Sequence, residues 1–481
     1  MEQFDLLVIG GGINGAAIAR DAAGRGLSVL LVEKDDLAAH TSSASSKLAH
    51  GGLRYLERYE FRLVRESLAE REVLLRNAPH VVRPLRFILP VAEGMRPRWM
   101  LRLGLLLYDL LALRGSLPRS RAVSRSDGAA RAPLKNGAGR ALLSYWDASA
   151  DDARLVALYA LDAAERGAEI ATRTEFLSAL REGGMWRVSL SGGREVTAPL
   201  IVNAAGPWVA EVLGRRIGEE SDARARLVRG SHIIVPALWE GEHAYILQQP
   251  DARVVFALPF EGATMIGTTD VPATGPGDVG ASSDEIAYLC AAANRYFERQ
   301  IAPGDVVWSF AGIRALWDDG AADPEDVTRD YRLELDEGLV SVFGGKLTTA
   351  RALASETLER LRVPGLKFTR TTPLPGGDLM PSFLAWLEDV AAWMEPALLA
   401  RLSRAYGTRM REIVGDATKM QDLGRHFGAG LHEAELRYLV DREFARTADD
   451  VLWRRTKLGL RFTEAEKRAL ERRLQSHSAA V

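Results

Sequence analysis

The feature that most constrains this chain is an apolar strand that runs into a cluster of glycines near its start. Residues 6–9 are apolar, Gly10, Gly12 and Gly15 follow with the spacing G-x-G-x-x-G, and a small-residue helix leads to a second apolar strand that ends at Glu33. In this arrangement Gly10 permits a tight turn, Gly12 lets the backbone approach a pyrophosphate, and Gly15 lets the helix pack on the strand. The unit therefore predicts a dinucleotide site at the N-terminus of the helix.

The acid at the end of the second strand narrows the choice of nucleotide. A carboxylate at this position accepts hydrogen bonds from an adenosine ribose, and Glu33 would repel a 2′-phosphate, which disfavours NADP. The glycines alone would also fit an ordinary glycine-rich turn. The ordered succession of strand, turn, helix, strand and acid favours the nucleotide site.

The composition is that of a soluble globular enzyme with more than one domain. The chain has 481 residues, of which 47% are hydrophobic and 26% are charged. The net charge of −2 gives no overall attraction for nucleic acid. The single cysteine, Cys290, excludes an internal disulfide and a thiolate metal cluster. Because the first residues run straight into a strand, without a basic or apolar leader, no signal peptide is expected.

One stretch, residues 95–121, combines arginines with apolar residues. It holds six arginines and a single acid, Asp109. Its apolar run is too short and too interrupted to span a bilayer of about 30 Å. Two interpretations remain open: a helix that lies in the membrane interface, with Trp99 and Tyr108 in it, or a buried core helix with arginine ends.

Three further regions follow from the turn and strand patterns. Short strands between residues 227 and 310, with a helix near 283–300, predict a separate antiparallel sheet that covers a substrate. Residues 338–349 repeat the order of strand and glycine turn, and the helix after them would point its N-terminus at the same ligand. Residues from about 380 to 475 are helical and arginine-rich, which predicts a C-terminal helical domain.

Motifs along nearly the whole chain carry a resemblance to one family. Beside the glycine fingerprint they are the segments 41–55, 151–155, 230–232, 267–270, 312–314, 328–331, 343–349 and 452–457. In these segments the chain resembles the FAD-dependent glycerol-3-phosphate dehydrogenases, respiratory enzymes that pass electrons to quinone. The chain departs from the family pattern at Ala315, where many relatives have proline, and in the sequence of residues 146–150. These departures bear on fine specificity.

The resemblance implies an α/β fold and its division into domains. It implies a glutathione-reductase-like, Rossmann-type FAD-binding domain, a D-amino-acid-oxidase-like substrate domain of mixed sheet plus helices, and the C-terminal helical domain. The cofactor that it implies is non-covalent FAD. We expect residues 1–80, 145–225 and 305–372 in the FAD-binding domain, residues 81–144 and 226–304 in the substrate or cap domain, and residues 380–475 in the C-terminal domain.

The resemblance also implies where FAD would lie. The glycine fingerprint would hold the pyrophosphate and Glu33 would hold the ribose. The serine-rich loop, which lies within residues 41–55, and the second glycine turn within residues 338–349 would hold the rest of the cofactor. The expected cofactor-binding residues are Gly10, Gly12, Ile13, Asn14, Gly15, Glu33, Thr41, Ser42, Ser43, Ser46, Lys47, Leu48, Gly51, Ala205, Gly206, Gly345, Lys346, Leu347 and Thr348. No group of residues has the spacing of metal ligands, so no metal site is expected.

Oxidation of a secondary alcohol by a flavin needs a hydride acceptor, a base for the hydroxyl proton and anchors for the charged end of the substrate. His232 is the first candidate for the base, and His50 is the competing one. Lys346 would stabilise negative charge on the flavin or on a substrate oxygen. The expected catalytic residues are His232, Lys346 and Arg314, and the expected substrate-binding residues are Arg54, Tyr55, His50, Thr268, Arg314 and Arg329.

These expectations describe an enzyme that oxidises sn-glycerol 3-phosphate to dihydroxyacetone phosphate with FAD and passes the electrons to membrane quinone. Its expected place is the cytoplasm, peripherally on the inner face of the cell membrane. No nucleic-acid partner is expected, and a homodimer is left open. The alternatives are an oxidase that uses oxygen, an amino-acid or amine oxidase of the same fold superfamily, and a partner-binding module on an inactive flavoprotein scaffold. The several predicted cations argue against the amino-acid oxidase.

Overall fold

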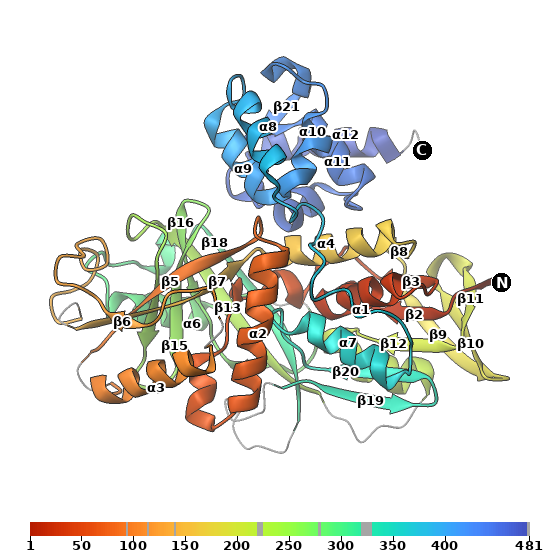
Figure 1. The fold of residues 1–481 in the computed structure, drawn as a ribbon, viewed down its shortest axis with the longest axis horizontal. Coiled ribbons are helices and arrows are strands. Elements are labelled where there is room, and N and C mark those ends of the chain that lie inside the picture. The colour runs from red at the N-terminus through yellow and green to blue at the C-terminus, as the bar shows by residue number, and fades with distance from the viewer. Residues whose placement is uncertain are drawn as a thin grey trace.

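The structure is a computed structural model that describes residues 1–92, 95–112, 115–138, 141–218, 225–277, 280–318 and 330–478, without the side chains of Arg54, Arg58, His477 and Ser478. Figure 1 shows three parts. A layered part with a parallel sheet holds the N-terminus, a second part is built on a larger sheet, and the C-terminal helices form a lobe of their own.

The first part is built on a sheet with the strand order β19-β20-β12-β2-β3-β8. Its strands are β2 (Leu6–Ile9), β3 (Val29–Glu33), β8 (Glu169–Thr172), β12 (Leu200–Asn203), β19 (Arg332–Asp336) and β20 (Leu339–Phe343). All neighbours run parallel except β19 and β20, which are antiparallel. Strand β2 is buried along its whole length, as expected of a parallel strand covered on both faces.

Helices cover this sheet at the glycine turn. Helix α1 (Ile13–Gly24) begins directly after the turn, and it packs against α4 (Asp152–Glu165) and α7 (Ala350–Arg360). Its Ala16, Ala19 and Ala22 are fully buried. Small side chains let neighbouring helices approach closely, which explains the alanine-rich sequence of α1. The predicted strand, glycine turn, helix and strand are therefore present.

A small sheet lies beside the parallel one. Its strand order is β1-β11-β10-β9, with β1 at Glu2–Gln3, β9 at Phe176–Glu182, β10 at Met185–Leu190 and β11 at Glu195–Ala198. The buried side chains of Trp186 and Val188 on β10 share a core with Leu7 and Leu30 of the parallel sheet. The two sheets are therefore packed as one unit.

The second part is a mixed sheet with the order β17-β13-β16-β15-β14-β5-β7-β4, in which β18 pairs with β13 and β6 pairs with β7. Its strands are β4 (Leu48–Ala49), β5 (Val82–Pro90), β6 (Arg121–Ala122), β7 (Leu142–Ala150), β13 (Ala225–Pro236), β14 (Ala244–Gln248), β15 (Val254–Phe260), β16 (Ala263–Gly267), β17 (Val271–Pro272) and β18 (Trp308–Trp317). Helices α2 (Phe61–Asn77), α3 (Arg98–Leu111) and α6 (Ser283–Asn294) accompany it.

The strand pairing differs from the expected division of the chain at three strands. We expected residues 1–80, 145–225 and 305–372 in the FAD-binding domain, but β4, β7 and β18 pair within the second sheet. Strand β18 pairs with β13 along its whole length, from Trp308 to Trp317. Such long-range pairing leaves no mark in the local sequence pattern, because it depends on a partner far away in the chain.

The C-terminal lobe has its own hydrophobic core and lies at the top of Figure 1. Its elements are α8 (Pro381–Ala391), α9 (Pro396–Tyr406), α10 (Met410–Val414), α11 (Glu433–Asp441), α12 (Glu464–Ser478) and the short pair β21 (His426–Gly428) and β22 (Leu431–His432). The predicted C-terminal helical domain is thus present. None of the helices in the described part of the chain has the length and apolar character needed to cross a membrane.

Candidate active site

One large cavity joins the glycine turn of the first part to the second sheet. Its volume is about 960 Å³. It is lined at one end by Gly10 and Gly12, further along by the second glycine turn, and at the other end by Met100 and Leu107 of α3. The cavity therefore runs between the two parts of the molecule, which is where ligand sites are commonly found.

The glycine turn forms a cradle at the N-terminus of α1. Gly10 has a φ of +106°, and a side chain there would lie 2.6 Å from the carbonyl oxygen of Ala204. A side chain at Gly15 would lie 1.9 Å from the carbonyl oxygen of Gly10, so its role is to let the helix pack on the strand, as the sequence predicts. The backbone N–H of Ile13 donates to the Oγ of Ser42 at 3.0 Å, which ties the serine-rich loop to the cradle.

Glu33 closes the outer end of this cradle. Its Oε2 accepts a hydrogen bond from the backbone N–H of Gly11 at 2.7 Å, and its Oε1 accepts one from Asp35 at 2.9 Å. Burial raises the pKa of its carboxyl, while these two backbone N–H groups lower it. The side chain lines the cavity. It therefore lies where the sequence predicts a ribose partner.

Three polar atoms of the cavity-lining residues are buried without a hydrogen-bond partner among the described residues. They are Oδ1 of Asn14, Nε2 of Gln248 and Nζ of Lys346. Asn14 is held by its Nδ2, which donates to the carbonyl oxygen of Gly344 at 3.1 Å, and the ammonium of Lys346 lies 4.0 Å from the centre of the Tyr55 ring. Because buried polar groups normally find partners, these three atoms indicate a polar ligand in the cavity.

A cationic group lines the cavity beside the second sheet. The guanidinium of Arg314 forms an ion pair with Asp270 and donates from Nη2 to the Oγ1 of Thr268 at 3.1 Å. Arg314, Thr268 and Asp270 all line the cavity. Two other predicted cations cannot be placed, because Arg329 and the side chain of Arg54 lie outside the described residues.

The two candidate bases occupy different positions. His50 lines the cavity, and burial lowers the pKa of its imidazole, so the neutral form that accepts a proton is favoured. His232 is 1% exposed and does not belong to the cavity lining. Its ring stacks on Phe310 at 4.9 Å, its Nε2 lies 2.9 Å from the Oγ of Ser46, and burial lowers its pKa to about 3.

Most of the predicted cofactor residues line the cavity. Besides those above they are Thr41, Leu48, Ala205, Gly206, Gly345, Leu347 and Thr348. Gly15, Ser43, Lys47 and Gly51 do not. Lys47 is buried in an ion pair with Asp152 at 2.8 Å and also donates to the carbonyl oxygen of Ser43, while the N–H of Gly51 donates to the hydroxyl of Tyr108. The structure thus gives Ser43, Lys47 and Gly51 contacts within the protein, and Gly15 serves the packing of α1.

Some residues that line the cavity are not among the site residues predicted from the sequence. Asp270 belongs to the motif 267–270, and Gly344 adjoins a predicted residue, so both had a signal in the sequence. Phe256 and Trp208 also line the cavity. The ammonium of Lys34 lies 3.8 Å from the centre of the Trp208 ring. No sequence pattern marks these two aromatic residues, because their place depends on packing between distant segments.

The fold and the cavity define a class of flavoenzyme, and comparisons with known proteins agree. Residues 5–360 match the family of FAD dependent oxidoreductases, and residues 367–478 match the C-terminal domain of alpha-glycerophosphate oxidase. The chain is thus an FAD-dependent oxidoreductase. More narrowly, it belongs to the FAD-dependent glycerol-3-phosphate dehydrogenase family, which confirms the resemblance seen in its motifs.

Individual relatives match over nearly the whole chain. A glycerol-3-phosphate dehydrogenase from Pseudomonas aeruginosa is 50% identical over 99% of this chain and 96% of its own length. A D-erythritol 1-phosphate dehydrogenase from Brucella abortus is also 50% identical, over 97% of each chain. The solved glycerol-3-phosphate dehydrogenase from Bacillus halodurans, complexed with FAD, has a TM-score of 0.72 at 25% identity and covers 98% of this chain and 94% of that chain.

The cavity fits FAD, the cofactor of this family. The glycine cradle and the N-terminus of α1 suit a pyrophosphate, and Glu33 suits a ribose. The unpartnered atoms of Asn14 and Lys346 suit the polar edge of a flavin ring. The predicted fold class and cofactor are therefore confirmed.

Proposed function

We propose that the protein oxidises sn-glycerol 3-phosphate to dihydroxyacetone phosphate. The observation that carries this proposal is that His50, Arg314 and Lys346 line the same cavity as the glycine cradle. A base, an anion anchor and a cation for developing negative charge thus face one space beside the cofactor site. The name of the Pseudomonas aeruginosa relative supports this choice of substrate.

In this proposal His50 takes the proton of the C2 hydroxyl group. Its lowered pKa keeps the imidazole neutral at physiological pH, and its place on the cavity surface lets a substrate reach it. FAD, when bound, supplies the hydride acceptor. Lys346, whose ammonium has no hydrogen-bond partner among the described residues, stabilises negative charge as the proton leaves. His232 keeps a positioning role behind Ser46 in this proposal.

The phosphate end would be held by Arg314. A guanidinium presents a fork of N–H donors that matches phosphate oxygens, and Thr268 adds a neutral hydroxyl beside it. A phosphomonoester carries close to two negative charges at neutral pH, so a second cation is needed. Arg54 and Arg329 remain the predicted candidates, with Tyr55 as a neutral partner.

The test compares substrates with and without the charged end. Purified holoenzyme should oxidise glycerol 3-phosphate with a kcat/KM far above that for glycerol, and the product should be dihydroxyacetone phosphate. Equal values for the two alcohols would contradict the phosphate anchor. Peroxide formed in proportion to turnover would favour the oxidase alternative over the dehydrogenase.

A second candidate substrate is D-erythritol 1-phosphate. The relative named for this activity is as similar to the chain, at 50% identity, as the Pseudomonas aeruginosa enzyme. Both substrates offer a secondary alcohol and a phosphate, so the same His50 and Arg314 would serve them. The ratio of the two kcat/KM values decides between them, and a higher value for erythritol 1-phosphate would replace the first choice.

For the electron acceptor we propose membrane quinone, reached through α3. This helix packs Leu105 and Tyr108 against the core, whereas Trp99 is 69% and Leu103 59% exposed on its other side. Its Met100 and Leu103 also line the cavity. The interface and core interpretations of this stretch are therefore compatible, because one face of the helix is buried and another offers apolar side chains to a bilayer. Exposed Arg98 and Arg102 would meet anionic headgroups.

This docking implies a peripheral place on the cytoplasmic face of the cell membrane, because quinone is confined to the bilayer. Binding of the purified protein to anionic vesicles tests it, and an equal affinity for neutral vesicles would contradict the arginine contribution. A homodimer remains a prediction, which sedimentation of the detergent-free and vesicle-bound enzyme checks.

A further inference from the structure

The segment 453–457 of the C-terminal domain takes no part in the proposed reaction, although its motif is one of those shared with the family. It lies at the end of the helical turn Asp450–Arg455, which packs on α4. Two of its charged residues, Arg455 and Lys457, are at most 4% exposed. Because buried charges need partners, the contacts of this segment say what it holds.

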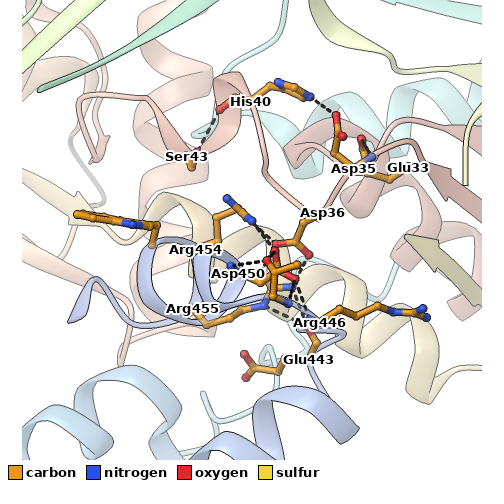
Figure 2. A network of polar contacts seen from close by, with 12 residues as sticks. Glu33, Asp35, Asp36, His40, Ser43, Glu443, Arg446, Asp450, Arg454 and Arg455 are labelled. Atoms are coloured by element: carbon orange, nitrogen blue, oxygen red, sulfur yellow. Dashed lines mark hydrogen bonds and ion pairs between the residues drawn. The ribbon is translucent and has the colours of Figure 1, made fainter. Parts of the chain in front are cut away.

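Arg455 contacts the loop beside the predicted nucleotide end of the cavity. It donates two hydrogen bonds of 2.9 Å to the carboxylate of Asp36, and Arg454 adds one of 2.6 Å, as Figure 2 shows. Asp36 is 1% exposed and follows Glu33 in the loop that leads to the turn Thr41–Ser43, of which Thr41 and Ser42 line the cavity. A bidentate arginine–carboxylate pair fixes direction as well as distance. The C-terminal domain thus fixes the loop beside the predicted ribose site.

A stack of aromatic rings leads from the same segment to another part of the cavity wall. The ring of Trp453 lies 4.4 Å from that of Trp308, Trp308 lies 4.9 Å from Phe310, and Phe310 lies 4.9 Å from His232. The Nε2 of His232 is in turn 2.9 Å from the Oγ of Ser46, which lines the cavity. In a close-packed interior a ring moves only if its neighbour moves, so the position of Trp453 is transmitted to Ser46.

Lys457 makes a third connection. Its Nζ lies 3.6 Å from the carboxylate of Asp151, the residue that caps the N-terminus of α4. The neighbouring Asp152 accepts hydrogen bonds from Lys47 at 2.8 Å and from the Oγ of Ser45 at 2.7 Å. Ser45 lines the cavity. All three connections therefore end at the loop that surrounds the cofactor site.

We propose that the segment 453–457 is a positioning element of the FAD site. Arg455 sets the nucleotide end through Asp36, and Trp453 sets the wall around Ser46 through the ring stack. The C-terminal domain thereby shapes a cavity to which none of its described residues contributes lining. The expected effect of Trp453 on turnover rests on the proposed function, whereas the expected effect of Arg455 on FAD retention does not.

The first experiment measures the release of FAD from holoenzyme by the rise of flavin fluorescence. Arg455→Lys keeps the charge but loses the two-point contact, and we expect release about tenfold faster, as the loss of one charged hydrogen bond predicts. Asp36→Asn should have the same effect. Arg409→Lys is the matched control, because Arg409 also pairs across the interface, 2.6 Å from Glu165, away from the cavity. Equal release rates in Arg455→Lys and Arg409→Lys would overturn the proposal.

The second experiment tests the ring stack. Trp453→Leu should shift the flavin absorbance band and lower kcat about fivefold with KM unchanged, the scale of one lost aromatic contact, and Trp453→Phe should restore both. Trp386→Leu in α8, which removes a stacked ring elsewhere in the same domain, is the control. If Trp453→Leu and Trp386→Leu have the same spectrum and kcat, the ring stack does not position the site. If glycerol 3-phosphate fails to reduce the wild-type flavin, the proposed function fails, while FAD release and absorbance still test this inference.

Discussion

Replacing Arg314 by alanine should lower kcat/KM for glycerol 3-phosphate by about 10- to 150-fold. The range corresponds to the 1.5–3 kcal/mol of a hydrogen bond to a charged group, at about 1.4 kcal/mol for each factor of ten. The structure places the loss at the upper end, because the change also deprives the Asp270 carboxylate of its ion pair with Arg314, and that carboxylate lines the same cavity. A negative charge there would repel the substrate phosphate.

The assay is anaerobic reduction of the flavin, followed by its absorbance over a range of substrate concentrations. Arg314→Lys keeps a positive charge without the fork and should lose less than Arg314→Ala. The double variant Asp270→Asn with Arg314→Ala should recover part of the loss, because it removes the repelling charge. FAD content should stay equal in all three variants. A kcat/KM within threefold of the wild-type value in Arg314→Ala would refute the assignment of this residue to the phosphate.

Three other predictions concern pH and membrane binding. Burial lowers the pKa of His50, so the rate of flavin reduction should stay constant above pH 6.5 and fall only at lower pH, where the imidazole becomes protonated. A decline in this rate that begins above pH 7 would exclude His50 as the base. Burial also lowers the pKa of His80 to about 3, so between pH 6.5 and 3 the unfolded chain binds more protons than the folded protein. The Tm should therefore drop as the pH falls through this range, and it should drop less steeply in the variant His80→Gln. Charge reversal at Arg98, Arg102 and Arg114 should weaken binding to anionic vesicles and slow quinone-linked turnover, with anaerobic flavin reduction nearly unchanged. If the triple variant binds vesicles as strongly as the wild type, α3 is not the docking surface.

The cofactor end of the site could be predicted from the sequence because its signals are local. The turn at Gly10 and Gly12 and the acid Glu33 lie within one strand, helix and strand, so their order in the chain fixes their order in space. The second glycine turn at Gly345 was found for the same reason. Each of these residues lines the cavity, and its contact with FAD stays a prediction.

Features that depend on long-range packing could not be predicted. The motif that contains His232 gave no sign that its ring would turn onto Phe310, because that contact comes from the pairing of β13 with β18. The buried pair of Lys47 with Asp152 joins distant segments in the same way, and a lysine in a serine-rich loop looks like a phosphate ligand until its partner is known. The contact of Asp36 with Arg455 likewise joins the two ends of the chain.

The most direct test of the account is to add glycerol 3-phosphate to the purified yellow protein in the absence of air. We expect the flavin absorbance to bleach with one equivalent of substrate, dihydroxyacetone phosphate to appear in the same amount, and His50→Asn to slow the bleaching without loss of bound FAD. Flavin that stays oxidised under a large excess of glycerol 3-phosphate, in protein that retains FAD, would contradict the proposed function.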